Sequence, residues 1–291
     1  MKKLLLSAFV ICLAGTSIAQ ESPLWMRHCA LSPDGTTIAF TYKGDIYTVP
    51  STGGRATQIT TNPAFDTEPV WSPDSKQIAF ASDRMGSLDV FVVSSEGGAP
   101  QRLTTHSGSE KPVAYKDNKH ILFTANIVPS AEDAGFPSGQ FQQVYEVAVT
   151  GGRPAMFSSM PMECISINKE GVMLYQDKKG YEDYWRKHQV SPIARDIWTY
   201  TPGKKPVYQK QTTFGGEDRE PVWSPDGKSF YYLSEEKGSF NIFQRTPGTT
   251  TSQQITFHTK HPVRFLSIST TGTLCYGYDG EIYTLTPGKQ P

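Results

Sequence analysis

One eight-residue phrase occurs twice in this chain, too far apart for a local turn. Residues 68–75 read EPVWSPDS and residues 220–227 read EPVWSPDG, with seven of eight letters the same. Weaker copies of the surrounding pattern lie before, between and after these two. A phrase repeated in order along a chain indicates repeated structural units, each packed against the next.

The second copy shows the unit most clearly, as four strand-like segments separated by turns. Apolar, β-branched and aromatic residues dominate these segments, which are residues 69–71, 77–82, 88–94 and 101–105. In the first turn, Pro73 sets the φ angle of position i+1, and Asp74 can accept a backbone hydrogen bond two residues on. The Gly-Gly pairs at 53–54, 97–98 and 151–152 are predicted to turn the chain into each fourth strand.

The phrase recurs six times at roughly 40–45 residues, the period and strand count of a β-propeller blade. Two copies are longer, because residues 126–142 and 179–193 are inserted into otherwise intact phrases. A β-sandwich would not repeat one phrase six times in order. The sequence therefore predicts an all-β fold, a six-bladed β-propeller with four-stranded antiparallel blades. These blades are expected at residues 25–60, 66–105, 110–157, 162–213, 218–256 and 261–291.

The last copy stops at TPGKQP (286–291), where earlier copies enter their fourth strand. We therefore expect an incomplete last blade, and a chain that is a fragment or one domain of a longer protein. Trp71 and Trp223 end the first strand of their copies and are predicted to pack between blades. Tyr115 and Phe265 are expected in related positions.

Residues 1–19 are predicted to be a secretory signal peptide. Lys2 and Lys3 precede the apolar run 4–14, and small residues stand at Ser17 and Ala19 before the predicted cleavage site. The alternative is a buried N-terminal helix. Export to the periplasm, or secretion, is the expected location, and no other stretch is long enough for a membrane anchor.

Charge and cysteine content exclude several classes of partner and cofactor. The formal net charge is zero, so neither nucleic acid nor an anionic membrane surface is an expected partner. Three cysteines follow the signal peptide, namely Cys29, Cys164 and Cys275. Their number is small and odd, which does not fit a disulfide framework, and they are expected to be small buried hydrophobic residues. Histidines and cysteines lack the spacing of a metal site, so no metal and no cofactor is predicted.

The blade phrase resembles those of TolB-like and tricorn-protease-like propellers. The inserted segment GYEDYWRKHQVSPIARDIWTY (180–200) resembles the fourth blade of the six-bladed N-terminal propeller of tricorn-protease homologues, and the resemblance covers residues 24–291. It implies a second propeller, a PDZ domain and a serine-peptidase core further along such a chain, with the propellers filtering short peptides. Family members also hold a substrate carboxylate with basic residues on this propeller. Here the corresponding loop, HSGSEKP (106–112), offers Lys111 beside Glu110.

Two sets of residues are candidates for contact. The blade 4 insertion carries aromatic and basic residues of the types enriched at interfaces, Tyr184, Trp185, Arg186, Lys187 and His188, followed by Arg195. Alternatively, this insertion folds back on its own blade. Charged residues before the first strands are predicted at one mouth of the axial channel, where they would act on peptide ends. They are Asp66, Glu68, Glu110, Lys111, Glu217, Asp218 and Glu220, and the alternative role is that of solvated loop acids and turn caps.

No nucleophile, base and oxyanion hole can be assembled from the sequence, so no catalytic residue is predicted. The predicted function is that of the non-catalytic propeller of an exported tricorn-like serine peptidase, acting as channel, filter and scaffold. Expected partners are peptides, a peptidase core and, in a homo-oligomer, a second copy. A stand-alone TolB-like periplasmic interaction propeller is the alternative, and an enzyme acting at the channel mouth is a third hypothesis.

Overall fold

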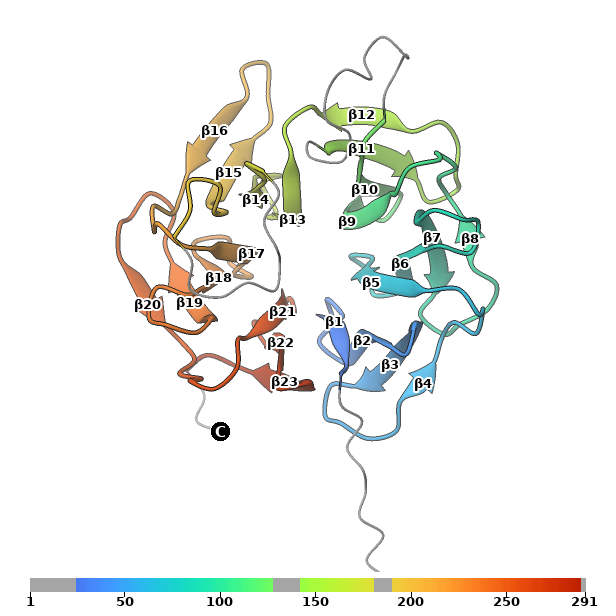
Figure 1. The fold of residues 1–291 in the computed structure, drawn as a ribbon, viewed down its shortest axis with the longest axis horizontal. Helices are drawn as coiled ribbons and strands as arrows, with labels where there is room; N and C mark the ends of the chain where they lie inside the picture. The colour runs from blue at the N-terminus through green and yellow to red at the C-terminus, as the bar shows by residue number, and fades with distance from the viewer. Residues whose placement is uncertain (1–24, 128–141, 181–189, 289–291) are drawn as a thin grey trace, which may run out of the picture.

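The computed structural model describes residues 25–127, 142–180 and 190–288. Their strands form six antiparallel sheets around a central axis, and the first strand of each sheet lies innermost (Figure 1). This arrangement confirms the predicted six-bladed propeller. The described part of the chain holds no helix with the length and apolarity needed to traverse a bilayer.

Each of the first five blades is a meander of four strands in chain order. Blade 1 contains β1 (Arg27–Leu31), β2 (Thr37–Tyr42), β3 (Asp45–Pro50) and β4 (Thr57–Gln58), and blade 2 contains β5 (Asp66–Trp71), β6 (Gln77–Ser82), β7 (Asp89–Ser94) and β8 (Gln101–Arg102). Blade 3 contains β9 (Lys111–Asp117), β10 (His120–Ala125), β11 (Gln143–Ala148) and β12 (Ala155–Ser158). Blade 4 contains β13 (Met162–Ile167), β14 (Met173–Asp177), β15 (Ile197–Thr201) and β16 (Val207–Lys210). Blade 5 contains β17 (Asp218–Trp223), β18 (Phe230–Ser234), β19 (Asn241–Arg245) and β20 (Ser252–Gln254).

Blade 6 is smaller than the others. Within the described residues it has three strands, β21 (Arg264–Ile268), β22 (Leu274–Tyr278) and β23 (Glu281–Leu285). The last blade therefore lacks a fourth strand in this part of the chain, as predicted.

The SPD turn between the first and second strands is held by its own side chains. In blade 2 the Ser72 hydroxyl donates to Asp74 Oδ1 at 2.7 Å, and Gln77 N donates to Ser72 Oγ at 2.9 Å. Blades 1 and 5 repeat the serine–aspartate bond at 2.6 Å, between Ser32 and Asp34 and between Ser224 and Asp226. In all three turns the serine hydroxyl lowers the aspartate pKa. Turn geometry thus explains the repeated letters.

The fourth strands are shorter than the sequence pattern predicts, because a threonine side chain replaces the backbone partner. After β8, Leu103 N still donates to Val90 O at 2.8 Å, but Val90 N donates to Thr104 Oγ1 at 2.9 Å. The same 2.9 Å bond is made by Thr60, Thr212 and Thr256 in blades 1, 4 and 5. The threonine hydroxyl therefore ends the backbone pairing, while the N–H of the third strand keeps a hydrogen-bond partner.

The hydrophobic core lies largely between neighbouring blades. Trp71 packs with Ala39 and Ile46 of blade 1, and its indole Nε1 donates to Ala30 O at 2.8 Å. Trp223 Nε1 donates in the same way to Val172 O of blade 4 at 3.1 Å. The predicted packing of both tryptophans between blades is confirmed.

Of the two related positions, the structure supports one. Tyr115 packs into a cluster with Ala79 and Val90 of blade 2. Phe265 does not occupy the tryptophan position, because Ile268 pairs with Leu274 where Trp71 pairs with Ile78. Phe265 instead matches Glu68, because each of these residues lies three positions before that pair, so the letter alignment was wrong by three positions.

The insertions connect strands that remain paired. β10 and β11 pair from His120↔Ala148 to Ala125↔Gln143, and β14 and β15 pair from Met173↔Tyr200 to Gln176↔Ile197. Residues 128–141 and 181–189, which join them, lie outside the described residues. The two long copies are therefore ordinary blades with an added connection.

Candidate functional site

Every innermost strand contains a register shift, and a β-bulge there leaves one residue unpaired and re-aims its side chain. In five blades this residue has a positive φ of 49–60°. In blade 3 the matching position by register is Pro112, opposite Phe123, and we take in its place the preceding Lys111, whose Nζ contacts Glu68. We call these six residues the axial ring: His28, Glu68, Lys111, Cys164, Glu220 and Phe265. The strands that carry them surround the central axis (Figure 1).

An ion pair joins the ring residues of blades 2 and 3. Lys111 Nζ lies 2.6 Å from Glu68 Oε1, and the two side chains remain 35% and 29% exposed. His28 lies beside them, with Nδ1 3.0 Å from Thr67 Oγ1 and its ring 4.8 Å edge-on from Phe265. Burial lowers the pKa of His28; Glu68 opposes this shift and Lys111 reinforces it. His28 is therefore neutral at pH 7.

The other half of the ring is organised by Glu220. Its backbone N donates to Gln176 Oε1 of blade 4 at 2.8 Å, and its Oε2 accepts from Leu266 N of blade 6 at 2.7 Å. Burial raises the pKa of the Cys164 thiol, and the carboxylates of Glu220, Glu163 and Glu68 raise it further. Glu68 contributes to this shift although it lies two blades away from Cys164.

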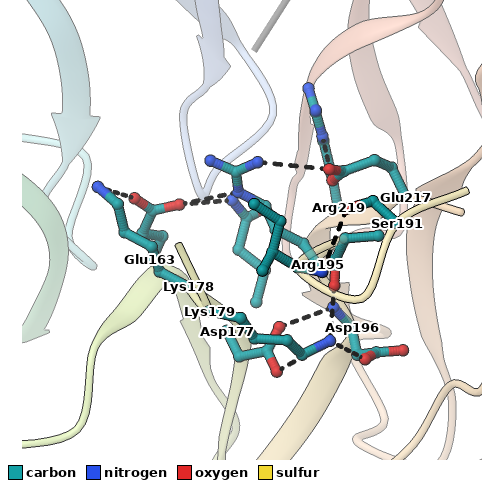
Figure 2. Close-up of polar contacts among 12 residues, drawn as sticks. Glu163, Asp177, Lys178, Lys179, Ser191, Arg195, Asp196, Glu217 and Arg219 are labelled. Atoms are coloured by element: carbon teal, nitrogen blue, oxygen red, sulfur yellow. Dashed lines mark hydrogen bonds and ion pairs between the residues drawn. The ribbon is translucent and has the colours of Figure 1, made fainter. Parts of the chain in front are cut away.

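A chain of four ion pairs joins blades 4 and 5 (Figure 2). Lys178 Nζ lies 3.2 Å from Glu163 Oε1, and Arg195 Nε lies 3.2 Å from Glu163 Oε2. Arg195 Nη1 is 3.5 Å from Glu217 Oε1, and Arg219 Nε is 2.8 Å from Glu217 Oε2. The side chains of Arg195, Glu217 and Arg219 are 7%, 1% and 2% exposed. This ion-pair chain is thus largely removed from water.

In this ion-pair chain, each charged group favours the ionised form of its partners. Burial tends to raise the pKa of Glu163, but Arg195 and Lys178 lower it below its usual value. Burial likewise tends to lower the pKa of Arg195, while Glu163 and Glu217 raise it. Arg195 is therefore the cation that Glu163 and Glu217 share.

Polar contacts also clamp the two ends of the blade 4 insertion (Figure 2). At the first end, Lys179 Nζ donates to Ala194 O at 2.6 Å and bonds the Asp196 carboxylate. Asp196 N donates to Asp177 Oδ1 at 2.8 Å, and Trp198 Nε1 donates to Asp177 Oδ2 at 3.0 Å. The described ends of the blade 4 insertion are therefore joined to each other by side-chain contacts.

The structure divides the predicted channel-mouth residues into two groups. Glu68, Lys111 and Glu220 belong to the axial ring, as described above. Glu220 is buried, and so are Asp66 and Asp218, which lie at the start of β5 and β17, where Arg84 pairs with Asp66 at 2.9 Å. Burial raises the pKa of Asp218 to about 7.

The two remaining channel-mouth acids are also buried. Glu217 belongs to the ion-pair chain, and Glu110 accepts from His106 N at 3.4 Å, with a pKa that burial raises. Among the insertion residues, Arg195 is central to the ion-pair chain. Tyr184, Trp185, Arg186, Lys187 and His188 lie outside the described residues. No group of three His, Cys, Asp or Glu side chains suited to a metal occurs in the described ranges.

Several site residues were missed from the sequence. His28, Cys164 and Phe265 belong to the axial ring, but their copies lack the proline that follows Glu68, Lys111 and Glu220. A usable signal was the position three residues before the packing residue of the first strand, as Glu68 precedes Trp71 and Glu220 precedes Trp223. Glu163 and Arg219 had no sequence signal, because their partners come from other strands and another blade.

Known proteins similar to this chain include one curated relative and two solved structures. Tricorn protease homolog 1 of Streptomyces coelicolor is 25% identical over 260 residues, which cover 87% of this chain and 23% of the relative. The crystal structure of the tricorn protease matches with a TM-score of 0.75 at 17% identity, covering 91% of this chain and 25% of that one. TolB from Acinetobacter baumannii matches with a TM-score of 0.64 at 15% identity, covering 89% and 65%.

The two tricorn matches are therefore about four times as long as the segment that they share with this chain, which covers 23% and 25% of them. At these identities the two structures show a common propeller fold. The profile of the tricorn protease N-terminal beta propeller domain matches residues 23–291. The chain belongs to this family.

Proposed function

We propose that this propeller is the non-catalytic channel, filter and scaffold of an exported tricorn-like serine peptidase. The axial ring is the observation that supports this role most directly. It gathers one side chain from each blade around the axis, including a base, two acids and a neutral histidine. A peptide passing along the axis would meet these groups at one level.

The Glu68–Lys111 pair is the part of the ring best suited to contact peptides. Both side chains are about one-third exposed, at 29% and 35%, and lie on neighbouring blades. A partly exposed ion pair contributes no more than about 1 kcal/mol, so either member can exchange its partner for a charged peptide end at little cost. The pair would therefore favour or disfavour peptides according to their terminal charges.

The scaffold role rests on the base of the blade 4 insertion. The ion-pair chain joins blades 4 and 5, and the Lys179–Asp196 contact joins the two described ends of the blade 4 insertion. An aromatic-basic segment that starts from a fixed base loses less conformational entropy on docking. The proposed partner is a peptidase core or, in a homo-oligomer, a second copy.

The coding frame beyond residue 291 gives the first test. A second propeller and a serine-peptidase core in the same frame would support the proposal. A stop codon soon after residue 291 would instead favour a stand-alone TolB-like interaction propeller, a reading in keeping with the match that covers 65% of the TolB chain.

The second test concerns the axial ring in the full-length protein. Lys111→Glu places a third carboxylate in the ring beside Glu68 and Glu220, so hydrolysis of short peptides with acidic ends should fall about tenfold relative to basic ones. Lys116→Glu is the matched control, because Lys116 lies on the same strand but pairs with Glu146 at 2.7 Å. An unchanged preference in Lys111→Glu, or the same change in both variants, would contradict the filter role.

A further inference from the structure

Blade 6 and blade 1, which come from opposite ends of the chain, meet without sharing a strand in the described residues. All strands of blade 6 come from residues 264–285 and all strands of blade 1 from residues 27–58, so in the described ranges neither sheet contains a strand from the other end of the chain. The ring of blades is therefore closed there by packing and by a few hydrogen bonds (Figure 1).

Several hydrogen bonds cross this junction. Leu31 N donates to Ser267 Oγ at 3.0 Å, Met26 N donates to Gly280 O at 3.2 Å, and Thr270 N donates to Pro33 O at 2.8 Å. Leu31 also ends β1 at the position where blade 2 carries Trp71, so the indole bond to the preceding blade has no counterpart here.

Two cysteines face each other across this junction. Cys29 of β1 and Cys275 of β22 share one buried cluster with Leu31, Ile38 and Phe40, and the Cys29 thiol donates to Phe265 O at 3.4 Å. Burial raises the pKa of the Cys29 thiol well above its usual value, and a hydrogen bond with the Cys275 thiol raises it further.

The repeat explains why these two positions meet. Cys29 precedes Ala30 as Pro69 precedes Val70, and Cys275 pairs with Ser267 as Ala39 pairs with Ala30. β1 lies against β22 of the preceding blade in the same way that β5 lies against β2. The two cysteines thus occupy paired positions of a blade junction, and in the described residues only this junction has cysteine at both.

We propose that Cys29 and Cys275 form a disulfide that covalently joins the last blade to the first. Both S–H bonds break and one S–S bond forms. The two electrons and two protons pass by thiol–disulfide exchange to an external disulfide of the glutathione or dithiol-oxidase class, which is reduced to two thiols. The odd cysteine, Cys164, lies on blade 4 and stays reduced.

The same burial that brings the thiols together protects them. Cys29 is 4% exposed and Cys275 is fully buried, and a thiol with a raised pKa is a poor nucleophile at neutral pH. The bond therefore forms during folding, or when the junction opens, and it is slow to form in the closed ring. Once formed, it spans most of the propeller and restricts the unfolded chain strongly.

Peptide mapping of the whole chain tests the proposal. The protein is unfolded, refolded in a buffer of reduced and oxidised glutathione, blocked with N-ethylmaleimide in denaturant and digested with trypsin without reductant. The expected product joins the tryptic peptides 28–43 and 265–289, while Cys164 carries the label. Labelling of both Cys29 and Cys275, or a bond from either to Cys12 or Cys164, would overturn it.

Thermal unfolding gives an independent measure. Oxidation should raise Tm by about 5–10 °C over the protein kept in dithiothreitol. Cys275→Ala should abolish this difference, and Cys164→Ala should retain it. If Cys275→Ala does not fold, the wild-type protein with and without reductant still decides, because an unchanged Tm between cross-linked and reduced protein contradicts closure of the ring by this bond. Neither readout depends on peptide handling, so the outcome is separate from the proposed function.

Discussion

Asp66 and Arg84 form a buried ion pair in blade 2, with Arg84 Nη2 2.9 Å from both carboxylate oxygens. Blade 5 has the same carboxylate without the cation. Asp218 pairs with Ser234 as Asp66 pairs with Ser82, and Glu236 stands two residues after that serine, where blade 2 has Arg84. Burial, together with the nearby carboxylates of Asp196 and Glu236, raises the pKa of Asp218 to about 7.

This difference predicts how stability depends on pH. The unfolded chain releases the Asp218 proton near the usual pKa of 3.8, but the folded chain keeps it until about pH 7. The free energy of unfolding should therefore fall as the pH rises between these values, by up to about 4 kcal/mol, and level off above them. Asp218→Asn should remove this loss and be the more stable protein at pH 8, as measured by Tm from pH 5 to 9.

Asp66→Asn is the matched control, since it changes the same position of another blade. It leaves Arg84 buried without its carboxylate and should destabilise by about 3 kcal/mol throughout the same series of Tm measurements. If Asp218→Asn instead loses stability at pH 8 as Asp66→Asn does, Asp218 is ionised in the folded protein and the prediction is wrong.

The tryptophans between blades should be among the most costly residues to remove. Trp223→Ala deletes a buried indole and its 3.1 Å bond to Val172 O, and should lower the free energy of unfolding by about 3–5 kcal/mol. Trp223→Phe should cost less, because most of the packing stays. Trp25→Ala, at a side chain that is 71% exposed, should change stability by no more than about 0.5 kcal/mol. Urea unfolding measures all three.

Arg195 should matter more than the other bases of the ion-pair chain. Arg195→Met leaves Glu163 and Glu217 without their shared cation and should cost about 3–5 kcal/mol of unfolding free energy. Arg153→Met, on an exposed turn, is the control and should be neutral within about 0.5 kcal/mol. Equal stabilities of the two variants in urea would mean that the ion-pair chain contributes nothing to holding blades 4 and 5.

Cys164 should be an unreactive thiol in the folded protein. Burial and the carboxylates of Glu220, Glu163 and Glu68 raise its pKa, so alkylation by iodoacetamide at pH 8 should be at least about tenfold slower than in the unfolded chain. Glu220→Gln removes the carboxylate that raises the thiol pKa most and should therefore speed the alkylation. Mass spectrometry of the labelled peptide gives the rate, and a folded-state rate equal to the unfolded one would show that the thiol titrates normally.

Much of the fold could be predicted because blade structure is local. The SPD turn depends on bonds between Ser72 and its neighbours up to five residues away, and each blade is a meander of adjacent strands. Such features repeat as letters. The β-bulges are the exception, since the register shift that puts Phe265 in the axial ring and Ile268 in the packing position changes no repeated letter.

The candidate site was much less predictable, because it is assembled from parts that are distant in the chain. Asp66, Glu68 and Glu220 look alike before their strands, yet one is paired inside a blade and two lie in the axial ring. Whether such a carboxylate is paired inside a blade or lies in the axial ring depends on the pleat of its strand, on the position of the β-bulge and on the residue that faces it.

Repeated letters and turn chemistry were thus sufficient for the architecture, the number of blades and the packing of Trp71 and Trp223. The partners of Arg195, the raised pKa of Asp218 and the meeting of Cys29 with Cys275 arose from closing the blades into a ring. The physical reason is that hydrogen bonds within a meander act over a few residues, whereas burial and charge pairing depend on whichever blade lies next in space.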